Sequence, residues 1–284
     1  MRCNTWGECC QIAWNSLQVK NITGRTNTVT KKAFFFDLDG TLAEHNLPAS
    51  MQDVEAIRAV RARGHSVFLC TGRTPCHIYD SILDIGFDGI IAGGGTHITL
   101  GGNMIYRKEI DPFIIGRIIE LFTTYGGFCI LEGEQSLYVI NPGNNNWGCD
   151  WHKISDPDVF VPHKGEFAGQ AVLKFSADAQ SCRPFSDKFY ADFNIIDHGG
   201  FLEFVPQGNS KSAGMRRVLD AVGIDYKDSV AFGDSPNDLD MLQFAGIGVA
   251  MGNATQAVKS AADEITAPLS ESGVSLTLNK YLTS

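Results

Sequence analysis

Short apolar runs alternate with amphipathic segments early in the chain. The runs Phe34–Phe36, His65–Cys70 and Gly89–Ala92 are apolar at most positions, as are strands buried on both faces of a parallel sheet. The segments between them, 50–60 and 75–85, carry apolar residues at helical spacing. This β-α-β-α-β alternation predicts a right-handed, doubly wound parallel sheet.

The pattern changes after Asp111. An amphipathic helix is expected over Phe113–Tyr125, with its apolar residues gathered on one face. Short strand-like segments and another helix follow, at 128–131, 137–140, 171–176 and 183–190. Because helices and strands no longer alternate regularly, this part is typical of an inserted α+β domain.

The parallel α/β pattern then resumes. Phe201–Phe204 is expected to lead back to the first sheet, before helices at 210–222 and 239–244 and strands at 229–232 and 248–250. The sequence therefore predicts an α/β protein with a doubly wound parallel-sheet core and an inserted α+β domain. The expected bounds are 31–111 and 199–284 for the core, 112–198 for the insertion and 1–30 for an N-terminal appendage.

Composition and charge narrow the classes of partner. The chain has 284 residues, 44% of them hydrophobic, which is ordinary for a globular protein. Its formal net charge is −9 and its longest basic run is Lys31-Lys32, so nucleic acid and anionic membranes are not expected partners. No apolar stretch approaches the roughly 20 residues of a membrane helix, and no secretory signal is evident. The eight cysteines are irregularly spaced, which favours reduced thiols and a cytoplasmic location.

Four polar clusters carry the candidate chemistry. They are Asp37 with Asp39, Thr71-Gly72-Arg73, Lys211, and Gly233–Asp238, and three of them follow predicted core strands. Ligands bind outside the carboxyl ends of the strands in such sheets. Two carboxylates placed there repel each other unless a cation lies between them, so a Mg²⁺ site is expected.

Phosphoryl transfer needs a nucleophile, an acid for the leaving oxygen, and cations and donors for the phosphoryl oxygens. This chain offers each of these parts once. We expect Asp37 to be the nucleophile and Asp39 to act first as the general acid and then as the base. Thr71 would donate a hydrogen bond to the phosphoryl group, and Lys211 would neutralise its charge. Asp234 would be a Mg²⁺ ligand, and Asp238 would support the metal directly or through water. Gly72 and Arg73 are candidate substrate contacts.

Simpler interpretations exist for each residue taken alone. Acids such as Asp234 and Asp238 are favoured at helix N-termini, and Thr71 could be a helix N-cap. Lys211 could be a solvated helix residue, and Arg73 is either a substrate contact or a surface charge. The polar residues of the inserted part that could contact a substrate are each more typical of a solvated surface: Glu134, His152, Lys174 and His198.

The four clusters, in this order, resemble the four motifs of haloacid dehalogenase-like phosphatases. The insertion lies between the Thr71 and Lys211 motifs, as does the type-IIB cap of the Cof-like subfamily. The resemblance covers the chain from about Lys31 onward. One departure is Gly93-Gly94-Gly95, where Cof-like proteins usually carry Asn-Gly-Ala, so an asparagine that could touch the substrate is missing.

The resemblance implies further roles. The backbone carbonyl of Asp39 would be a third protein ligand to Mg²⁺, and Asn237 would contact the phosphoryl group or orient the metal ligands. The cap would close over the pocket and contact the leaving group. Members of the subfamily mostly hydrolyse small phosphate monoesters, hexose phosphates prominent among them.

Three functions stay open on the sequence. A Mg²⁺-dependent phosphatase of small phosphorylated metabolites is the leading hypothesis, with sugar phosphates as the expected substrates. A phosphomutase of the phosphomannomutase type is the nearest alternative. A sensor that binds phosphate or Mg²⁺ without turnover is a third, although a complete set of catalytic residues argues against it. The sequence gives no indication of the oligomeric state.

Overall fold

A computed structural model describes residues 30–44, 47–141, 160–162 and 171–282. The predicted appendage, apart from its last residue, and His152 lie outside these ranges. Within them, no helix combines the length and apolar character that crossing a bilayer requires.

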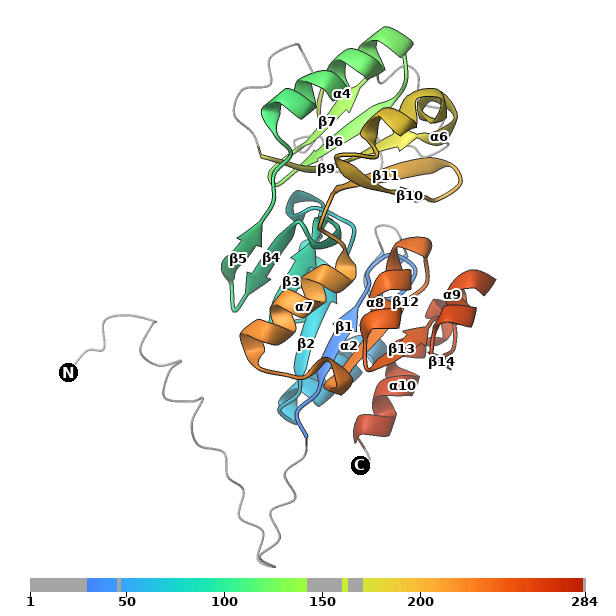
Figure 1. The fold of residues 1–284 in the computed structure, drawn as a ribbon. Coiled ribbons are helices and arrows are strands. Elements are labelled where there is room, and N and C mark those ends of the chain that lie inside the picture. Colours follow the sequence, from blue (N-terminus) through green and yellow to red (C-terminus); the bar gives the residue numbers. More distant parts are fainter. Residues whose placement is uncertain (1–29, 45–46, 142–159, 163–170, 283–284) are drawn as a thin grey trace, which may run out of the picture. The chain divides into compact units, whose positions relative to one another are not determined.

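The first sheet has eight strands in the order β14-β13-β12-β1-β2-β3-β4-β5 (Figure 1). Their bounds are β1 (Ala33–Phe36), β2 (Ser66–Cys70), β3 (Gly89–Ala92), β4 (His97–Leu100), β5 (Asn103–Arg107), β12 (Ser229–Gly233), β13 (Ile247–Ala250) and β14 (Glu264–Ile265). The strands from β14 to β3 are parallel, as predicted. The hairpin β4–β5 extends the sheet in antiparallel fashion, which the sequence pattern did not indicate.

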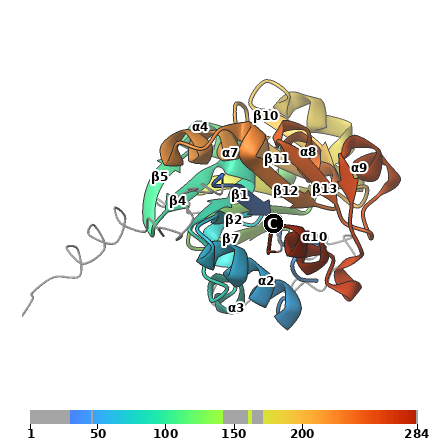
Figure 2. The same ribbon diagram turned by 90° about the horizontal axis from the view of Figure 1, so that it is seen from below.

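Helices cover both faces of this sheet (Figure 2). On one face α2 (Met51–Ala62) and α10 (Gly273–Leu282) pack on Phe34 and Phe36. On the other, α7 (Lys211–Val222), α8 (Leu239–Phe244) and α9 (Gln256–Ala261) pack with Phe35. Successive side chains of a strand point to opposite faces, so the all-apolar β1 serves both cores. The doubly wound α/β fold is thereby confirmed.

The second sheet has six strands in the order β10-β11-β9-β6-β7-β8. Their bounds are β6 (Cys129–Gly133), β7 (Leu137–Ile140), β8 (Phe160–Pro162), β9 (Val172–Asp178), β10 (Phe193–Asp197) and β11 (Phe201–Pro206). The helices α4 (Pro112–Tyr125) and α6 (Ala179–Cys182), with the 3-10 helix η4 (Arg183–Phe189), cover one face, seen at the top of Figure 1. An aromatic core fills this layer, in which the rings of Phe175 and Phe204 stack at 4.1 Å.

One element differs from its expected place. Phe201–Phe204 was expected to lead back to the first sheet, but β11 pairs with β9 and β10 in the second sheet. The cause is the aromatic core, because Leu202 and Phe204 point into it while Glu203 points to the opposite face. The second sheet therefore continues to Pro206.

The helix expected over residues 75–85 is divided. A 3-10 turn, η1 (Pro75–His77), is separated from α3 (Asp80–Leu83) by Ile78 and Tyr79 in extended conformation. Residues at this interruption contact Arg73. Its guanidinium donates to the carbonyl of His77 at 3.1 Å and lies 4.9 Å from the centre of the Tyr79 ring.

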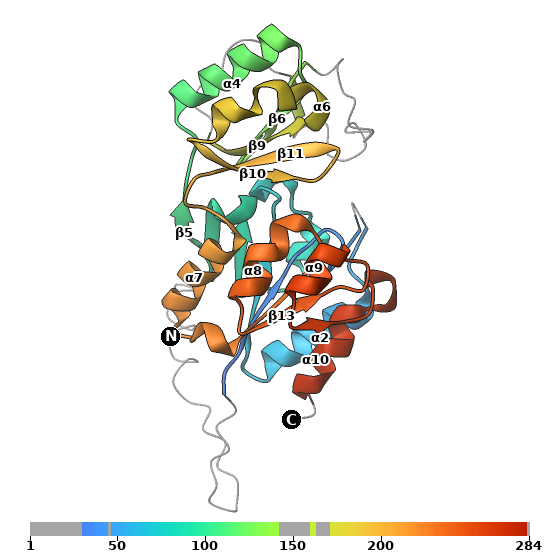
Figure 3. The same ribbon diagram turned by 45° about the vertical axis from the view of Figure 1, so that its right-hand side comes forward.

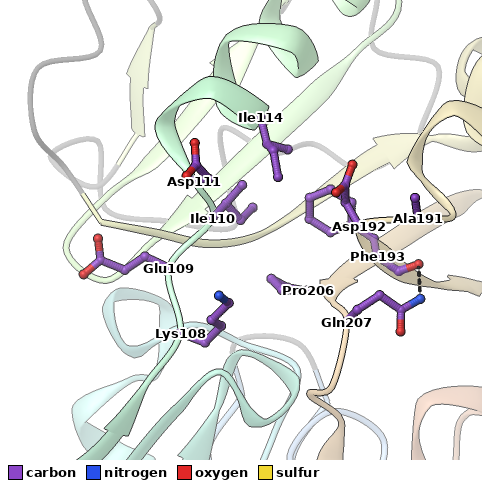
Figure 4. Close-up of a pocket in the computed structure, with 10 residues that line it drawn as sticks. All are labelled: Lys108, Glu109, Ile110, Asp111, Ile114, Ala191, Asp192, Phe193, Pro206 and Gln207. Carbon is purple, nitrogen blue, oxygen red and sulfur yellow. Dashed lines mark hydrogen bonds between the residues drawn. The ribbon is translucent and has the colours of Figure 1, made fainter.

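Two linkers join the sheets, one from β5 to α4 and one from β11 to α7 (Figure 3). A cavity of about 220 Å³ lies between them, lined by residues 108–111, 114, 191–193, 206 and 207 (Figure 4). There the Gln207 amide donates to the carbonyl of Phe193 at 3.1 Å. The two linkers thus run side by side.

Candidate active site

The predicted site lies where three parallel strands end. Asp37 follows β1, Thr71 follows β2, and Asp234 follows β12, and β12, β1 and β2 are neighbours in the sheet. Their carboxyl ends therefore meet at one edge. The backbone N–H of Asp37 still bonds to the carbonyl of Phe232 at 3.0 Å, which fixes its position relative to β12.

Lys211 lies between two carboxylates. Its ammonium donates to Asp37 Oδ1 and to Asp238 Oδ1, each at 2.5 Å, and all three side chains are buried. Burial alone would lower the pKa of Lys211, but the carboxylates of Asp238 and Asp37 outweigh it and raise that pKa well above its usual value. Lys211 is thus a buried permanent cation, not a solvated helix residue.

Asp238 also organises the loop that carries Asp234. Its Oδ2 accepts hydrogen bonds from the backbone N–H groups of Asp234 and Ser235, each at 2.9 Å. Asp234 in turn accepts from the Thr41 hydroxyl at 3.3 Å. Gly40 makes this approach possible, because its φ is +85° and a Cβ there would lie 2.2 Å from Asp234 Oδ2.

Negative charge exceeds positive charge in this cluster. Oxygen atoms of Asp37, Asp234 and Asp238 lie within 4.8 Å of one another, and Lys211 is the cation that contacts two of them. Burial is the larger cause and repulsion from Asp238 the next, and together they raise the pKa of Asp37 well above its usual value. The same two causes raise the pKa of Asp234 to about 7. Closely spaced carboxylate oxygens are the donors that Mg²⁺ prefers, so the residues present fit this ion.

The Asp39 side chain is paired with a residue outside that cluster. Its carboxylate forms a two-pronged ion pair with Arg73, with N–O distances of 2.5 and 2.7 Å. The Asp39 side chain is 44% exposed, whereas that of Arg73 is 9% exposed. Arg73 is therefore not a free surface charge, and the Asp39 side chain is not among the three carboxylates grouped above as possible metal ligands.

The other predicted residues lie around the same edge. Thr71 is buried, and its hydroxyl oxygen accepts from the backbone N–H of Arg73 at 3.1 Å, so its own O–H is available to donate within the part of the chain that the structure describes. Asn237 accepts from the Ser235 hydroxyl at 2.6 Å and donates to Glu203 Oε2 at 3.3 Å. A Cβ on Gly72 would lie 3.1 Å from Glu203 Oε1 and 3.2 Å from the Asn237 amide.

Polar residues of the second sheet depart from the expected solvated surface. Lys174 is 4% exposed and donates to Glu203 Oε1 at 2.6 Å. His198 contacts Glu203 Oε2 at 3.0 Å, with 12% of its side chain exposed. Glu134, in contrast, is partly exposed and pairs with Arg107.

A cavity of about 410 Å³ lies beside Lys211 and Glu203, with lining residues from both sheets' sides. Its walls include Lys211, Asn237 and Gly94 from the first sheet's side, and Glu203 and Val205 from the second. Of the residues predicted for the site, Lys211 and Asn237 line this cavity, which has the size of small-molecule sites.

The fold and the site together are those of a family of hydrolases. The family model of haloacid dehalogenase-like hydrolases matches residues 34–278, so the chain belongs to that family and is a hydrolase. The resemblance to this family drawn from the four motifs is confirmed.

Particular relatives agree with the assignment. YkrA of Bacillus subtilis is 28% identical over 86% of this chain and 95% of its own length. The 5-amino-6-(5-phospho-D-ribitylamino)uracil phosphatase YitU of the same organism is 26% identical, with coverages of 86% and 95%. Among solved structures, the HAD subclass IIB sugar phosphatase BT4131 is 27% identical, with a TM-score of 0.77 and coverages of 88% and 99%. These matches confirm the expected type-IIB, Cof-like relationship.

Two residues at the site were not singled out from the sequence. Thr41 was given no role, and Glu203 was considered only as part of a strand. Glu203 did carry a signal, since it is the one acid inside the apolar run Phe201–Pro206. An acid in such a run is rarely buried unless it is paired.

Proposed function

We propose that this protein is a Mg²⁺-dependent phosphatase of small phosphate monoesters that forms an aspartyl-phosphate on Asp37. The observation that carries the proposal is the arrangement of Lys211 between Asp37 and Asp238, with Asp234 alongside. This places a nucleophilic carboxylate next to a fixed cation at the end of β1. The phosphatase names of the relatives YitU and BT4131 support the same reaction.

The first step transfers the phosphoryl group. A carboxylate oxygen of Asp37 attacks phosphorus, the bond from phosphorus to the leaving oxygen breaks, and Asp39 gives its proton to that oxygen. Because Asp39 is paired with Arg73, its side chain has to turn toward the substrate to do this. The Thr71 hydroxyl and the Lys211 ammonium would hold the phosphoryl oxygens.

The second step regenerates the enzyme. Asp39, now ionised, takes a proton from water, the water oxygen attacks phosphorus, and the bond to Asp37 breaks to release phosphate. Asp37, Asp234 and the Asp39 carbonyl would hold Mg²⁺, with Asp238 in support. The bound ion would lessen the repulsion between phosphate and these carboxylates.

Mg²⁺ binding is expected to strengthen with pH. A carboxyl group must lose its proton before it can bind the ion, and the pKa of Asp234 is raised to about 7. The ion should therefore bind at least about tenfold more weakly at pH 6 than at pH 8. Below its pKa, each carboxyl group that must lose a proton weakens binding by about tenfold per pH unit, and the pKa of Asp37 is raised as well. Calorimetric titration of the substrate-free protein with Mg²⁺ at several pH values measures this, and a constant affinity would contradict it.

Asp39→Ala should affect substrates according to their leaving group. Alkyl phosphates, whose leaving oxygen needs a proton, should lose about 10² to 10⁴ in kcat/KM, the usual contribution of a general acid. p-Nitrophenyl phosphate should lose less than about tenfold, because nitrophenolate departs without a proton. The value of kcat/KM isolates the first step, so the later role of Asp39 as a base does not interfere. Equal losses for both substrates would show that Asp39 is not the acid.

Sugar phosphates are the substrates that we propose. BT4131 is named as a sugar phosphatase and YitU as the phosphatase of a phosphorylated ribityl compound, so both names refer to phosphates of polyhydroxylated carbon chains. The cavity of about 410 Å³ next to Lys211 has room for a leaving group of this size.

Phosphate release from a panel of sugar phosphates, nucleotides and cofactor phosphates, with Mg²⁺ and with a chelator, tests the proposal. We expect release that requires Mg²⁺ and is fastest with hexose or pentose phosphates. No release from any compound would overturn the phosphatase. Isomerised sugar phosphate formed in the presence of a bisphosphorylated sugar would identify a mutase instead.

A further inference from the structure

A buried polar row crosses the second sheet on the face opposite its helices. It consists of Glu132 on β6, Lys174 and Ser176 on β9, and Glu203 on β11, each at most 8% exposed. Lys174 donates to Glu203 at 2.6 Å and lies 3.3 Å from Glu132, which accepts from Ser176 at 2.6 Å. The proposed reaction uses none of these four residues.

Stability does not account for this row. Removing charges from water is costly, and apolar residues of similar volume often replace a buried ion pair without loss of stability. The neighbours of the row on these strands, such as Phe175 and Phe204, show that the sheet already has a well-packed apolar face. A function at the other face is therefore the simpler explanation for Lys174 and Glu203.

Glu203 is the member of the row that reaches the active site. Its Oε2 accepts from the Asn237 amide, and its Oε1 lies 3.1 Å from where a Cβ on Gly72 would be. Glu203 also lines the cavity of about 410 Å³, as does Lys211. Gly72 adjoins Thr71, and both Thr71 and Asn237 are expected at the phosphoryl group, so Glu203 lies beside the place where the leaving group begins.

The Glu203 carboxylate retains capacity to accept. Oε2 receives the Asn237 amide and contacts His198, whereas Oε1 accepts from Lys174 alone among the residues that the structure describes. A carboxylate has about four acceptor positions. The remaining one belongs to Oε1, which lies near Gly72 and Gly94, and Glu203 is among the residues that line the cavity of about 410 Å³.

We propose that Glu203, held in place by Lys174, accepts a hydrogen bond from a hydroxyl on the carbon next to the phosphorylated carbon of the substrate. It would thereby select phosphorylated polyols and sugars over phosphates that lack this hydroxyl. Ile196, Val205 and Leu239 line the same cavity and would contact the carbon atoms of such a molecule. This inference rests on the proposed phosphatase activity and concerns its choice of substrate.

A matched pair of substrates tests it. Glycerol 1-phosphate carries the hydroxyl in question, and 1,3-propanediol monophosphate differs only in lacking it. The wild-type enzyme should prefer glycerol 1-phosphate by about 10- to 100-fold in kcat/KM, the range for a hydrogen bond to a charged group. Hydrolysis of p-nitrophenyl phosphate shows whether the enzyme is a phosphatase at all. Activity on that ester without any preference within the pair would overturn this inference and leave the phosphatase intact.

The triple variant Glu132→Gln/Lys174→Met/Glu203→Leu separates recognition from structure. It replaces Lys174 and Glu203 with apolar side chains of similar size and makes residue 132 neutral, so no buried charge is left unpaired in the row and the fold should persist. We expect the preference to fall to within about threefold of unity. If Glu203 only positioned Asn237, both substrates would slow equally and the ratio would survive, which would refute the proposal.

Glu132→Gln is the control within the same row. Glu132 contacts Lys174 and Ser176 but is not among the residues that line the cavity. Its amide oxygen can still accept from both partners, so the substrate preference should match that of the wild type. Loss of the preference in this variant would mean that the row acts through general packing, and the role assigned to Glu203 would be wrong.

Discussion

Asp37→Asn should lower the turnover number by at least about 10⁴-fold, because an amide cannot serve as the nucleophile that accepts the phosphoryl group. The fold should persist. Asparagine has nearly the same shape, its oxygen can still accept from Lys211, and one of three closely spaced acids is removed. Steady-state phosphate release and thermal unfolding measure the two effects.

Asp220→Asn is the matched control for this variant. Asp220 is exposed near the end of α7, so its replacement should change neither turnover nor unfolding. Turnover in Asp37→Asn within tenfold of the wild type would remove Asp37 from the mechanism.

Lys211→Met should impair both activity and stability. Without the ammonium, the buried carboxylates of Asp37 and Asp238 face each other uncompensated. Removing one partner of a buried ion pair costs about 3–5 kcal/mol. We therefore expect the free energy of unfolding, measured in the absence of Mg²⁺, to decrease by about this amount. Turnover should fall by about 10³-fold or more, because an anionic substrate would meet Asp37 without this cation. Denaturant unfolding and phosphate release check both results.

Mg²⁺ should restore part of the stability of Lys211→Met, since it supplies positive charge to the same cluster. Lys280→Met provides the comparison, because the Lys280 side chain is 60% exposed in its ion pair with Glu264. Exposed pairs contribute at most about 1 kcal/mol, so this variant should remain close to the wild type. Equal stability losses in the two variants would contradict the role given to Lys211.

The meeting of three of the four motifs could be predicted because it follows from the fold. Once β1, β2 and β12 are taken as parallel neighbours, Asp37, Thr71 and Asp234 must lie at one edge of the sheet. The apolar runs were enough to indicate these strands. The positions of these three residues thus needed only the strand pattern and the rule that parallel strands end together, whereas Lys211, at the start of α7, follows a strand of the second sheet.

The pairing of Arg73 with Asp39 could not be predicted. It depends on the break between η1 and α3, which turns the His77 carbonyl and the Tyr79 ring toward the guanidinium. Apolar spacing alone predicted one continuous helix there. In the structure the break instead comes with a hydrogen bond from the Arg73 side chain to the His77 carbonyl, four residues along the chain.

The polar row that contains Glu203 could not be predicted from the sequence, for a different reason. Lys174 lies opposite Glu132 through the pairing of β6 with β9, and next to Glu203 through the pairing of β9 with β11. These strands are far apart in the sequence, and their register is set by the aromatic core on the other face. Each polar residue taken alone therefore resembled a surface position.

The most direct test of the account is whether a phosphoryl group becomes attached to Asp37. The enzyme would be mixed with Mg²⁺ and p-nitrophenyl phosphate, quenched with acid within milliseconds, digested with pepsin and examined by mass spectrometry. We predict one added phosphoryl group on the peptide that contains Asp37, and none in Asp37→Asn. Rapid release of phosphate with no phosphorylated peptide, or with the group on another residue, would contradict the mechanism proposed for this site.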